Sequence, residues 1–126
     1  MRQRYTWTKA EKLKSRKRIE WVFKEGKSLS VFPFKVFYLL LHPPAPPQAG
    51  FGAGSRHFKK AVDRNRIKRL SREAYRLQKQ PLMEALAEKE RSMALFFIYT
   101  GKELPDHGTV KAKIGVLLQK LIKEVK

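Results

Sequence analysis

One stretch of the chain carries cations at the spacing of a single helix face. Arg64, Lys68, Arg72 and Arg76 recur at every fourth residue. At about 100° per residue, this spacing aligns them along one side of a helix. Like charges so placed repel each other by roughly 0.2–0.5 kcal/mol per pair, which weakens the free helix. A polyanion that relieves the repulsion is the simplest explanation for the row, because arginine presents a planar fork that matches phosphate oxygens.

The other side of this stretch is apolar, which predicts how the helix is positioned. Ile67, Leu70, Ala74 and Leu77 fall within an arc of about 80°, and we expect this face to dock on a sheet. The alternative for the cations is an ordinary solvated face, but such faces carry mixed charge, whereas residues 59–72 hold a single acidic side chain. Three further side chains flank the cationic row: Asn65, Arg69 and Tyr75.

The net charge of the chain is strongly positive and unevenly distributed. The sequence holds 29 Lys and Arg against 11 Asp and Glu, a formal net charge of +18 at pH 7. Residues 1–27 hold 10 basic and 3 acidic side chains, or +7, and residues 56–80 hold 10 and 2, or +8. This much self-repulsion on a small chain calls for a polyanionic partner, and two concentrated blocks favour a shaped binding surface. Nucleic acid is therefore the leading candidate partner.

Other kinds of chemistry find little support in the sequence. The chain has no cysteine, which excludes disulfides and thiolate metal sites, and His42, His57 and His107 lack metal-ligand spacing. No carboxylate pair or Ser/His/Asp set stands out, so we expect no catalytic residue and no metal site on the protein. The longest apolar run, residues 36–41, is far shorter than the ~18 residues of a membrane span. We therefore expect a soluble, cytoplasmic protein that has no membrane segment and no obligate protein partner.

The elements before the basic helix are predicted to be an arm, a short helix and two strands. Residues 1–16 are basic and polar, as expected of an arm that becomes ordered on RNA. Apolar residues at i, i+3 and i+4 predict a short helix over residues 17–25 that ends at Gly26. Residues 34–41 are rich in β-formers, prolines follow, and residues 50–55 restart as a strand. A hairpin with a proline-rich loop is the natural arrangement of these two strands.

The basic helix is expected over residues 62–80, and the rest of the chain predicts a further strand between helices. A shorter helical segment is expected at 82–91, a strand at 93–99, and an amphipathic helix whose apolar residues recur from 114 to 125. This order predicts an α+β fold, an α/β two-layer sandwich in which about three helices accompany a mostly antiparallel sheet of about four strands. We expect residues 1–126 to form one domain. Gly50, Gly52 and Gly54 share one strand face, and we expect a helix to pack there in preference to a phosphate loop.

The basic helix resembles a known motif. Its residues Ala61-Val62, Arg64-Asn65-Arg66-Ile67-Lys68-Arg69, Arg72-Glu73 and Tyr75-Arg76 are similar to the RNR motif of bacterial ribonuclease P protein subunits. The chain length, the order of elements and the short helix ending at Gly26 resemble the same family. The resemblance implies a left-handed βαβ crossover in the sheet. It also implies a catalytic RNA as partner, which removes the 5′ leader from precursor tRNA with Mg²⁺ that is bound mainly by the RNA.

The resemblance further implies two groups of site residues. The motif helix would face the catalytic RNA, and a cleft between the first helix and the sheet would hold the single-stranded leader. Aromatic rings stack on any base, so such a cleft tolerates different leader sequences. The residues implied to bind the catalytic RNA are Lys59, Lys60, Arg64, Asn65, Arg66, Lys68, Arg69, Arg72 and Arg76. The residues implied to bind the leader are Ile19, Trp21, Phe23, Lys35, Phe37, Ser55 and Arg56.

Some features depart from the family pattern, and other interpretations stay open. Ile19 stands where the family usually has an aromatic residue, and Trp21 is the candidate replacement. Residues 55–60 read Ser-Arg-His-Phe-Lys-Lys, without the glycine that the family usually has there. Phe23 and Phe37 could instead be core residues. A non-catalytic RNA assembly protein, such as a ribosomal protein, and a DNA-binding regulator are the alternative functions, although no dimerising element is evident.

Overall fold

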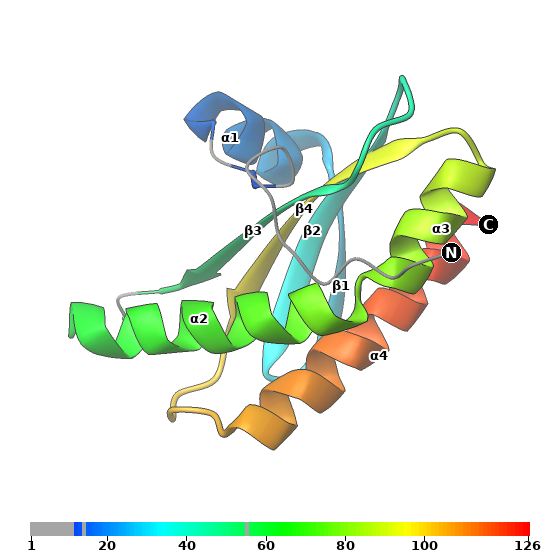
Figure 1. Ribbon diagram of the computed structural model, residues 1–126. Coiled ribbons are helices and arrows are strands. Elements are labelled where there is room, and N and C mark those ends of the chain that lie inside the picture. Colours follow the sequence, from blue (N-terminus) through cyan, green and yellow to red (C-terminus); the bar gives the residue numbers. More distant parts are fainter. Residues whose placement is uncertain (1–11, 14, 55) are drawn as a thin grey trace.

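The computed structural model describes residues 12–13, 15–54 and 56–126, and shows helices packed on a sheet (Figure 1). The elements are α1 (Arg16–Glu25), β1 (Lys27–Val31), β2 (Phe34–Leu41), β3 (Gln48–Ala53), α2 (Ala61–Gln78), α3 (Gln80–Glu88), β4 (Ser92–Tyr99) and α4 (His107–Val125). The α+β class is confirmed, with four helices in the described chain where about three were expected. α3 is separate from α2 because Pro81 occupies its first turn, where the missing N–H breaks no hydrogen bond.

The strands form one sheet in the order β1-β2-β4-β3. β2 is antiparallel to both β1 and β4, whereas β3 is parallel to β4. The predicted hairpin of residues 34–41 with residues 50–55 is therefore wrong, because β4 lies between these strands. Neighbours in sequence often pair, but here β4 matches β2 along its whole length, from Phe34 opposite Tyr99 to Leu41 opposite Ser92.

The parallel pair of β3 and β4 is connected through α2 and α3. Parallel strands cannot be joined by a tight turn, so the chain must cross one face of the sheet between them. The two helices make this crossover and cover that face (Figure 1). The βαβ unit that the family resemblance implied is thus present.

β1 is a strand that the sequence analysis did not predict. Its residues alternate between polar side chains and the half-buried Leu29 and Val31, as is typical of a strand with one face in contact with the core. It lies at the edge of the sheet and pairs with β2 from Lys27 opposite Tyr38 to Val31 opposite Phe34. The alternation directly after Gly26 was the available signal, but five residues with two apolar positions make a weak pattern.

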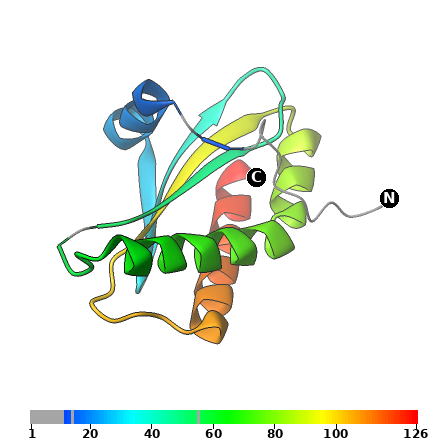
Figure 2. The ribbon, with the colours of Figure 1, turned by 60° about the vertical axis from the view of Figure 1, so that its left-hand side comes forward.

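The two faces of the sheet are covered differently (Figures 1 and 2). On one face, α2, α3 and α4 enclose the main hydrophobic core, in which Val36, Phe97 and Ile114 are fully buried. α1 lies on the opposite face, where Val22 is buried with Ala94 in a smaller cluster. Because α1 is a helix of only 10 residues, it covers part of this face and leaves the rest accessible.

α2 docks on the core through a face that differs from the predicted one. Its buried residues are Ile67, Ser71, Ala74 and Tyr75. Leu77 is 39% exposed, and Tyr75, which was expected beside the cations, is completely buried. The ring of Tyr75 lies 5.6 Å from that of Phe51 and 5.8 Å from that of Phe97. Compared with the predicted orientation, the helix is therefore rotated about its axis, so that Tyr75 beside the cations is buried and Leu77 is exposed.

α4 begins at His107, earlier than the apolar repeat from residue 114 indicated. Asp106 caps its first turn, since its carboxylate accepts a hydrogen bond of 2.6 Å from the backbone N–H of Thr109. This hydrogen bond holds the pKa of Asp106 below its ordinary value. The predicted apolar stripe of the helix is confirmed, because Ile114, Leu117 and Leu121 are buried in the core.

Candidate nucleic-acid interface

Three aromatic rings gather on the face of the sheet that α1 only partly covers. The ring of Phe23 on α1 stands edge-on to the ring of Phe37 on β2 at 4.8 Å, and edge-on to that of Phe96 on β4 at 5.2 Å. Phe23 is 38% exposed and Phe37 is half-buried, so neither belongs to the main core. The structure thus brings the two predicted cleft aromatics into contact with each other.

Lys35 adds a positive charge to this aromatic cluster. Because successive residues of a strand point to opposite faces, Lys35 and Phe37 share one face of β2. The Lys35 ammonium lies 5.0 Å from the centroid of the Phe37 ring, a distance at which the ring attracts a cation. The predicted placement of this pair is confirmed.

Phe96 is the member of the cluster that sequence reasoning missed. Gly50 of β3 lies opposite Phe96 in the sheet. A Cβ built on Gly50 would lie 2.7 Å from the ring of Phe96, and one on Gly52 would lie 3.0 Å from it. These glycines therefore leave space for an aromatic ring of the neighbouring strand, and the expected packing of a helix on them is wrong. The strand of residues 93–99 is apolar on both faces, so only the pairing shows which ring faces α1.

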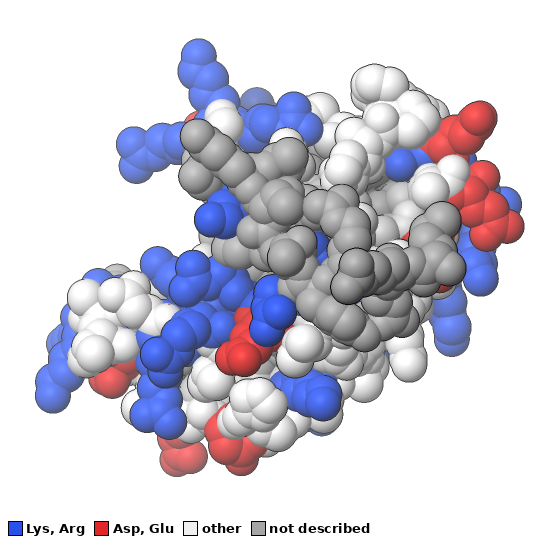
Figure 3. All heavy atoms as spheres, viewed as in Figure 1, with Lys and Arg blue, Asp and Glu red and all other residues white. Residues whose placement is uncertain are grey.

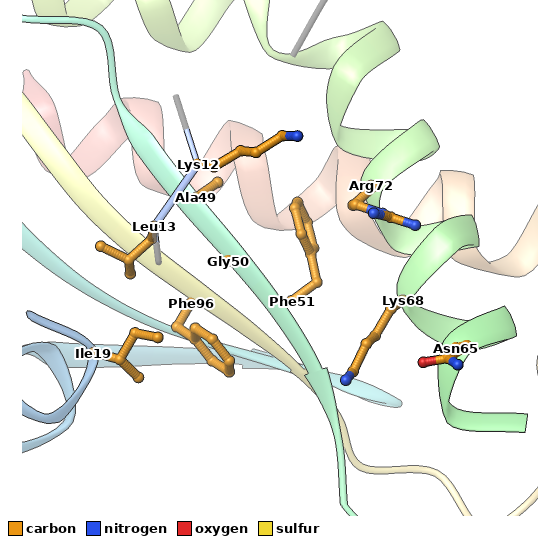
Figure 4. Close-up of a pocket in the computed structure, with 10 residues that line it drawn as sticks. All are labelled: Lys12, Leu13, Ile19, Ala49, Gly50, Phe51, Asn65, Lys68, Arg72 and Phe96. Atoms are coloured by element: carbon orange, nitrogen blue, oxygen red, sulfur yellow. The ribbon is translucent and has the colours of Figure 1, made fainter. Parts of the chain in front are cut away.

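A hollow of about 530 Å³ extends from this cluster across β3 to α2 (Figure 4). Ile19 of α1 and Phe96 of β4 line one side, and Lys68 and Arg72 of α2 line the other. Asn65 stands beside them on α2. One open groove thus has an aromatic and aliphatic side and a cationic side.

The cationic residues of α2 continue from this groove onto the surface of the protein. Arg66 and Arg69 are exposed, as are Lys59 and Lys60 in the segment before the helix. Arg69 and Arg76 line a second, shallower hollow on the helix together with Glu73. Figure 3 shows Lys and Arg side chains gathered over α1 and over α2, on either side of the indentation between these helices.

Arg64, which was predicted to bind RNA, makes hydrogen bonds within the protein. Its Nη1 donates hydrogen bonds of 2.6 Å to the carbonyl of Phe58 and 2.9 Å to the carbonyl of Lys59. Phe58 is buried, with its ring 5.9 Å from that of Tyr99. The guanidinium therefore ties the first turn of α2 to the loop that carries Lys59 and Lys60.

The remaining predicted leader-binding residues are dispersed. Trp21 does not line the groove; it lies in a different hollow, with Arg18 and the proline-rich loop. It is therefore not a substitute for an aromatic ring at Ile19, because residues 19 and 21 of a helix point about 200° apart. Arg56 is exposed in the segment between β3 and α2. Ser55 lies outside the described residues.

The end of the predicted N-terminal arm belongs to the folded part of the protein. Most of residues 1–16 lie outside the described chain. Leu13, however, is buried beside Val22, and its backbone N–H donates to the carbonyl of Ala49 at 3.0 Å. Ser15 caps α1, and Arg16 is its first residue. The predicted end of the arm at residue 16 is therefore too late in the chain, because Leu13 already packs beside Val22 and pairs with β3, and α1 begins at Arg16.

Two further kinds of site are absent from the described part of the chain. Its His, Asp and Glu side chains form no group of three or more that could hold a metal ion. None of its helices combines the length and the hydropathy that crossing a membrane requires.

Comparison with known proteins shows the family. A sequence model of the family described as Ribonuclease P matches residues 7–122. The ribonuclease P protein component of Porphyromonas gingivalis is 41% identical over 106 residues, which cover 82% of this chain and 77% of that protein. That of Chlorobaculum tepidum is 38% identical over 86 residues, covering 64% of this chain and 56% of that protein.

Solved structures show the same fold. The ribonuclease P protein from Thermotoga maritima superposes with a TM-score of 0.70 at 30% identity, covering 87% of this chain and 96% of that one. The Staphylococcus aureus protein, at 18% identity, superposes with a TM-score of 0.67 and covers 94% of this chain and 100% of that one. Taken with the match of the family's sequence model along most of the chain, these likenesses mean that the chain belongs to the ribonuclease P protein family.

Proposed function

We propose that the chain is the protein subunit of a ribonuclease P ribonucleoprotein, in which it binds the catalytic RNA and the 5′ leader of precursor tRNA. The observation that carries this proposal is the groove between Phe96 on one side and Lys68 and Arg72 on the other. Phe96 joins it to the aromatic cluster, because its ring contacts that of Phe23, which in turn contacts that of Phe37. Aromatic rings and cations together are the usual means of holding single-stranded nucleic acid.

The outer cations of α2 are assigned to the catalytic RNA. Arg66 and Arg69 are exposed on the side of the helix away from the core. Phosphate contacts of this kind release counterions, so that affinity falls steeply with salt. If about five to eight phosphates are neutralised, the logarithm of affinity should fall against the logarithm of salt concentration with a slope of about −4 to −7.

The groove and the aromatic cluster beside it are assigned to the leader of the substrate. Phe23 and Phe37 are partly exposed, so a base can stack on them, and the Lys35 ammonium lies 5.0 Å from the Phe37 ring, within reach of a phosphate. Stacking contributes about 1–3 kcal/mol per base and depends little on which base is bound. Such a site suits leaders of different sequence.

In this proposal the chain contributes binding, and the RNA carries the catalysis. Mg²⁺ held mainly by the RNA supplies the hydrolytic chemistry when bound. The side chains of the groove hold the leader extended away from the cleavage site, and the cations of α2 hold the RNA and the protein together. The holoenzyme, and not the protein alone, is then the endoribonuclease that generates the mature 5′ end of tRNA.

Reconstitution tests the proposal. The purified chain is added to ribonuclease P RNA of Porphyromonas gingivalis, the source of a relative 41% identical to it. The Mg²⁺ concentration required for 5′ cleavage of precursor tRNA should fall. A test variant has Arg66, Lys68 and Arg69 of α2 changed to alanine. Its matched control loses the same charge elsewhere, with Lys111, Lys120 and Lys123 of α4 changed to alanine.

The first triple variant should lose most of the effect and the second should keep it. An RNA assembly protein of another kind would bind RNA without lowering the Mg²⁺ requirement. That outcome, or equal loss in both triple variants, would contradict the proposed function.

A further inference from the structure

An exposed tryptophan stands on the side of α1 that faces away from the groove. Trp21 is 40% exposed, although tryptophan buries more apolar surface than any other residue when it is packed. The guanidinium of Arg18, one turn earlier, lies 5.7 Å from the centroid of the indole. A large aromatic face with an adjacent positive charge is thus held on a rigid helix.

The indole forms one wall of a separate hollow of about 390 Å³, remote from those on α2. The other walls come from the ends of strands and from the proline-rich loop, with Leu41, Pro43, Pro46 and Met93 among the lining residues. This volume lies within the range of about 300–1,000 Å³ that is typical of small-molecule sites. The loop that the sequence analysis treated as the turn of a hairpin therefore helps to enclose a site.

The polar groups of this hollow select the class of ligand. Arg18 is its charged member, His42 and Ser92 supply hydrogen-bonding groups, and none of the described lining residues is acidic. Apolar walls, an aromatic face and a cation match a planar base that is linked to a phosphate. A simple anion would leave the apolar walls unused, and a purely apolar ligand would leave the guanidinium without a partner of opposite charge.

We propose that this hollow binds one unpaired nucleotide of RNA, with its base stacked on Trp21 and its phosphate beside Arg18. The site is distinct from the groove, because the residues that line the two hollows do not overlap. The inference rests on the proposed function, since it takes RNA as the partner of the protein. The nucleotide comes either from the catalytic RNA or from a part of the leader beyond the groove.

Fluorescence tests the contact directly. The chain has two tryptophans, so full-length protein carrying Trp7→Phe reports on Trp21 alone. Titration with an eight-nucleotide oligoadenylate at low salt should change the Trp21 emission in a saturable way. Inorganic polyphosphate, which carries charge but no bases, should leave the emission unchanged. No response to the oligonucleotide, or an equal response to polyphosphate, would overturn the proposal.

Affinity measurements identify the source of the nucleotide. Trp21→Ala should weaken binding by about 5- to 150-fold, as expected for one lost stacking contact, and Trp21→Phe should recover most of the loss. A weaker complex with the catalytic RNA alone would assign the nucleotide to that RNA. A defect only in holoenzyme binding of precursor tRNA with a long leader, relative to mature tRNA, would assign it to the leader.

The matched control is Phe32→Ala, which removes another exposed aromatic ring, in the turn between β1 and β2. If Trp21→Ala behaves like this control in both binding assays, the proposal is wrong. Failure of the unmodified protein to bind the catalytic RNA would instead contradict the proposed function. The fluorescence titration would then still decide whether the hollow binds a nucleotide.

Discussion

Arg64 and Arg66 belong to the same motif, yet the structure predicts opposite consequences for their removal. Each substitution to alanine removes one positive charge from α2. Arg64 donates two hydrogen bonds to the carbonyls of the preceding loop, whereas Arg66 is exposed on the outer side of the helix. A hydrogen bond of this kind contributes about 0.5–1.5 kcal/mol to stability. Arg64→Ala should therefore lower the free energy of unfolding by about 1–3 kcal/mol, and Arg66→Ala should change it by less than about 0.5 kcal/mol.

Thermal unfolding of the free protein measures this difference. For a chain of 126 residues, 1 kcal/mol corresponds to roughly 4 °C in Tm, so Arg64→Ala should melt about 4–12 °C lower. Arg66→Ala should melt within about 2 °C of the unmodified protein.

The salt dependence of binding to the catalytic RNA separates the two roles further. Loss of one phosphate contact makes the slope shallower by about 0.9, and we expect this change for Arg66→Ala. Arg64→Ala should keep the original slope while its affinity falls at every salt concentration, because the loop that carries Lys59 and Lys60 is no longer held. Equal melting temperatures and equally reduced slopes for both variants would show that Arg64 acts as a phosphate contact and that its bonds to the loop are incidental.

Alanine at Phe23 or Phe37 should weaken holoenzyme binding of leader-bearing precursor tRNA by about 1–3 kcal/mol. If such a variant melts normally and the ratio of its affinities for precursor and mature tRNA is unchanged, these rings do not bind the leader. Ile67→Ala should cost about 2–5 kcal/mol of stability in chemical denaturation, whereas Leu77→Ala should cost much less because that side chain is 39% exposed; equal costs would contradict the observed docking face. Because the pKa of Asp106 is lower in the folded protein than in the unfolded chain, its contribution to stability is present above the unfolded pKa and is lost as the pH falls through the folded one. Asp106→Asn should flatten this acid dependence in unfolding experiments, and an unchanged pH profile would contradict the capping role.

Several elements could be predicted from the sequence because the responsible signals are local. The apolar stripe of α4 and the apolar runs of β2 and β4 depend on periodicity within a few turns or residues. The alternation of a strand is equally local, and it placed Lys35 beside Phe37 correctly. The basic motif is contiguous, so its charge and its family resemblance are visible without any tertiary contact.

The arrangement of these elements was decided by contacts between distant parts of the chain. β3 pairs with β4 and not with β2, because β4 occupies the edge of β2 that β3 would need. The sequences of β2 and β3 alone do not show that a later strand takes this edge. The rotation of α2 depends on the aromatic contacts that Tyr75 makes with the sheet, so Leu77 became exposed although it is the more apolar residue.

The functional site shows the same division between what local sequence indicates and what tertiary contacts decide. Residue types identified the cations and the aromatic side chains, but a helix presents residues 19 and 21 on different sides, and only the docking of α1 shows that Ile19 faces the groove while Trp21 faces the other hollow. The role of Arg64 likewise depends on where the loop before α2 is anchored, which is set by burial of Phe58. Local sequence therefore determined which groups this protein can use, and tertiary packing determined which of them face one another, because packing energy is shared among residues that are far apart in the chain.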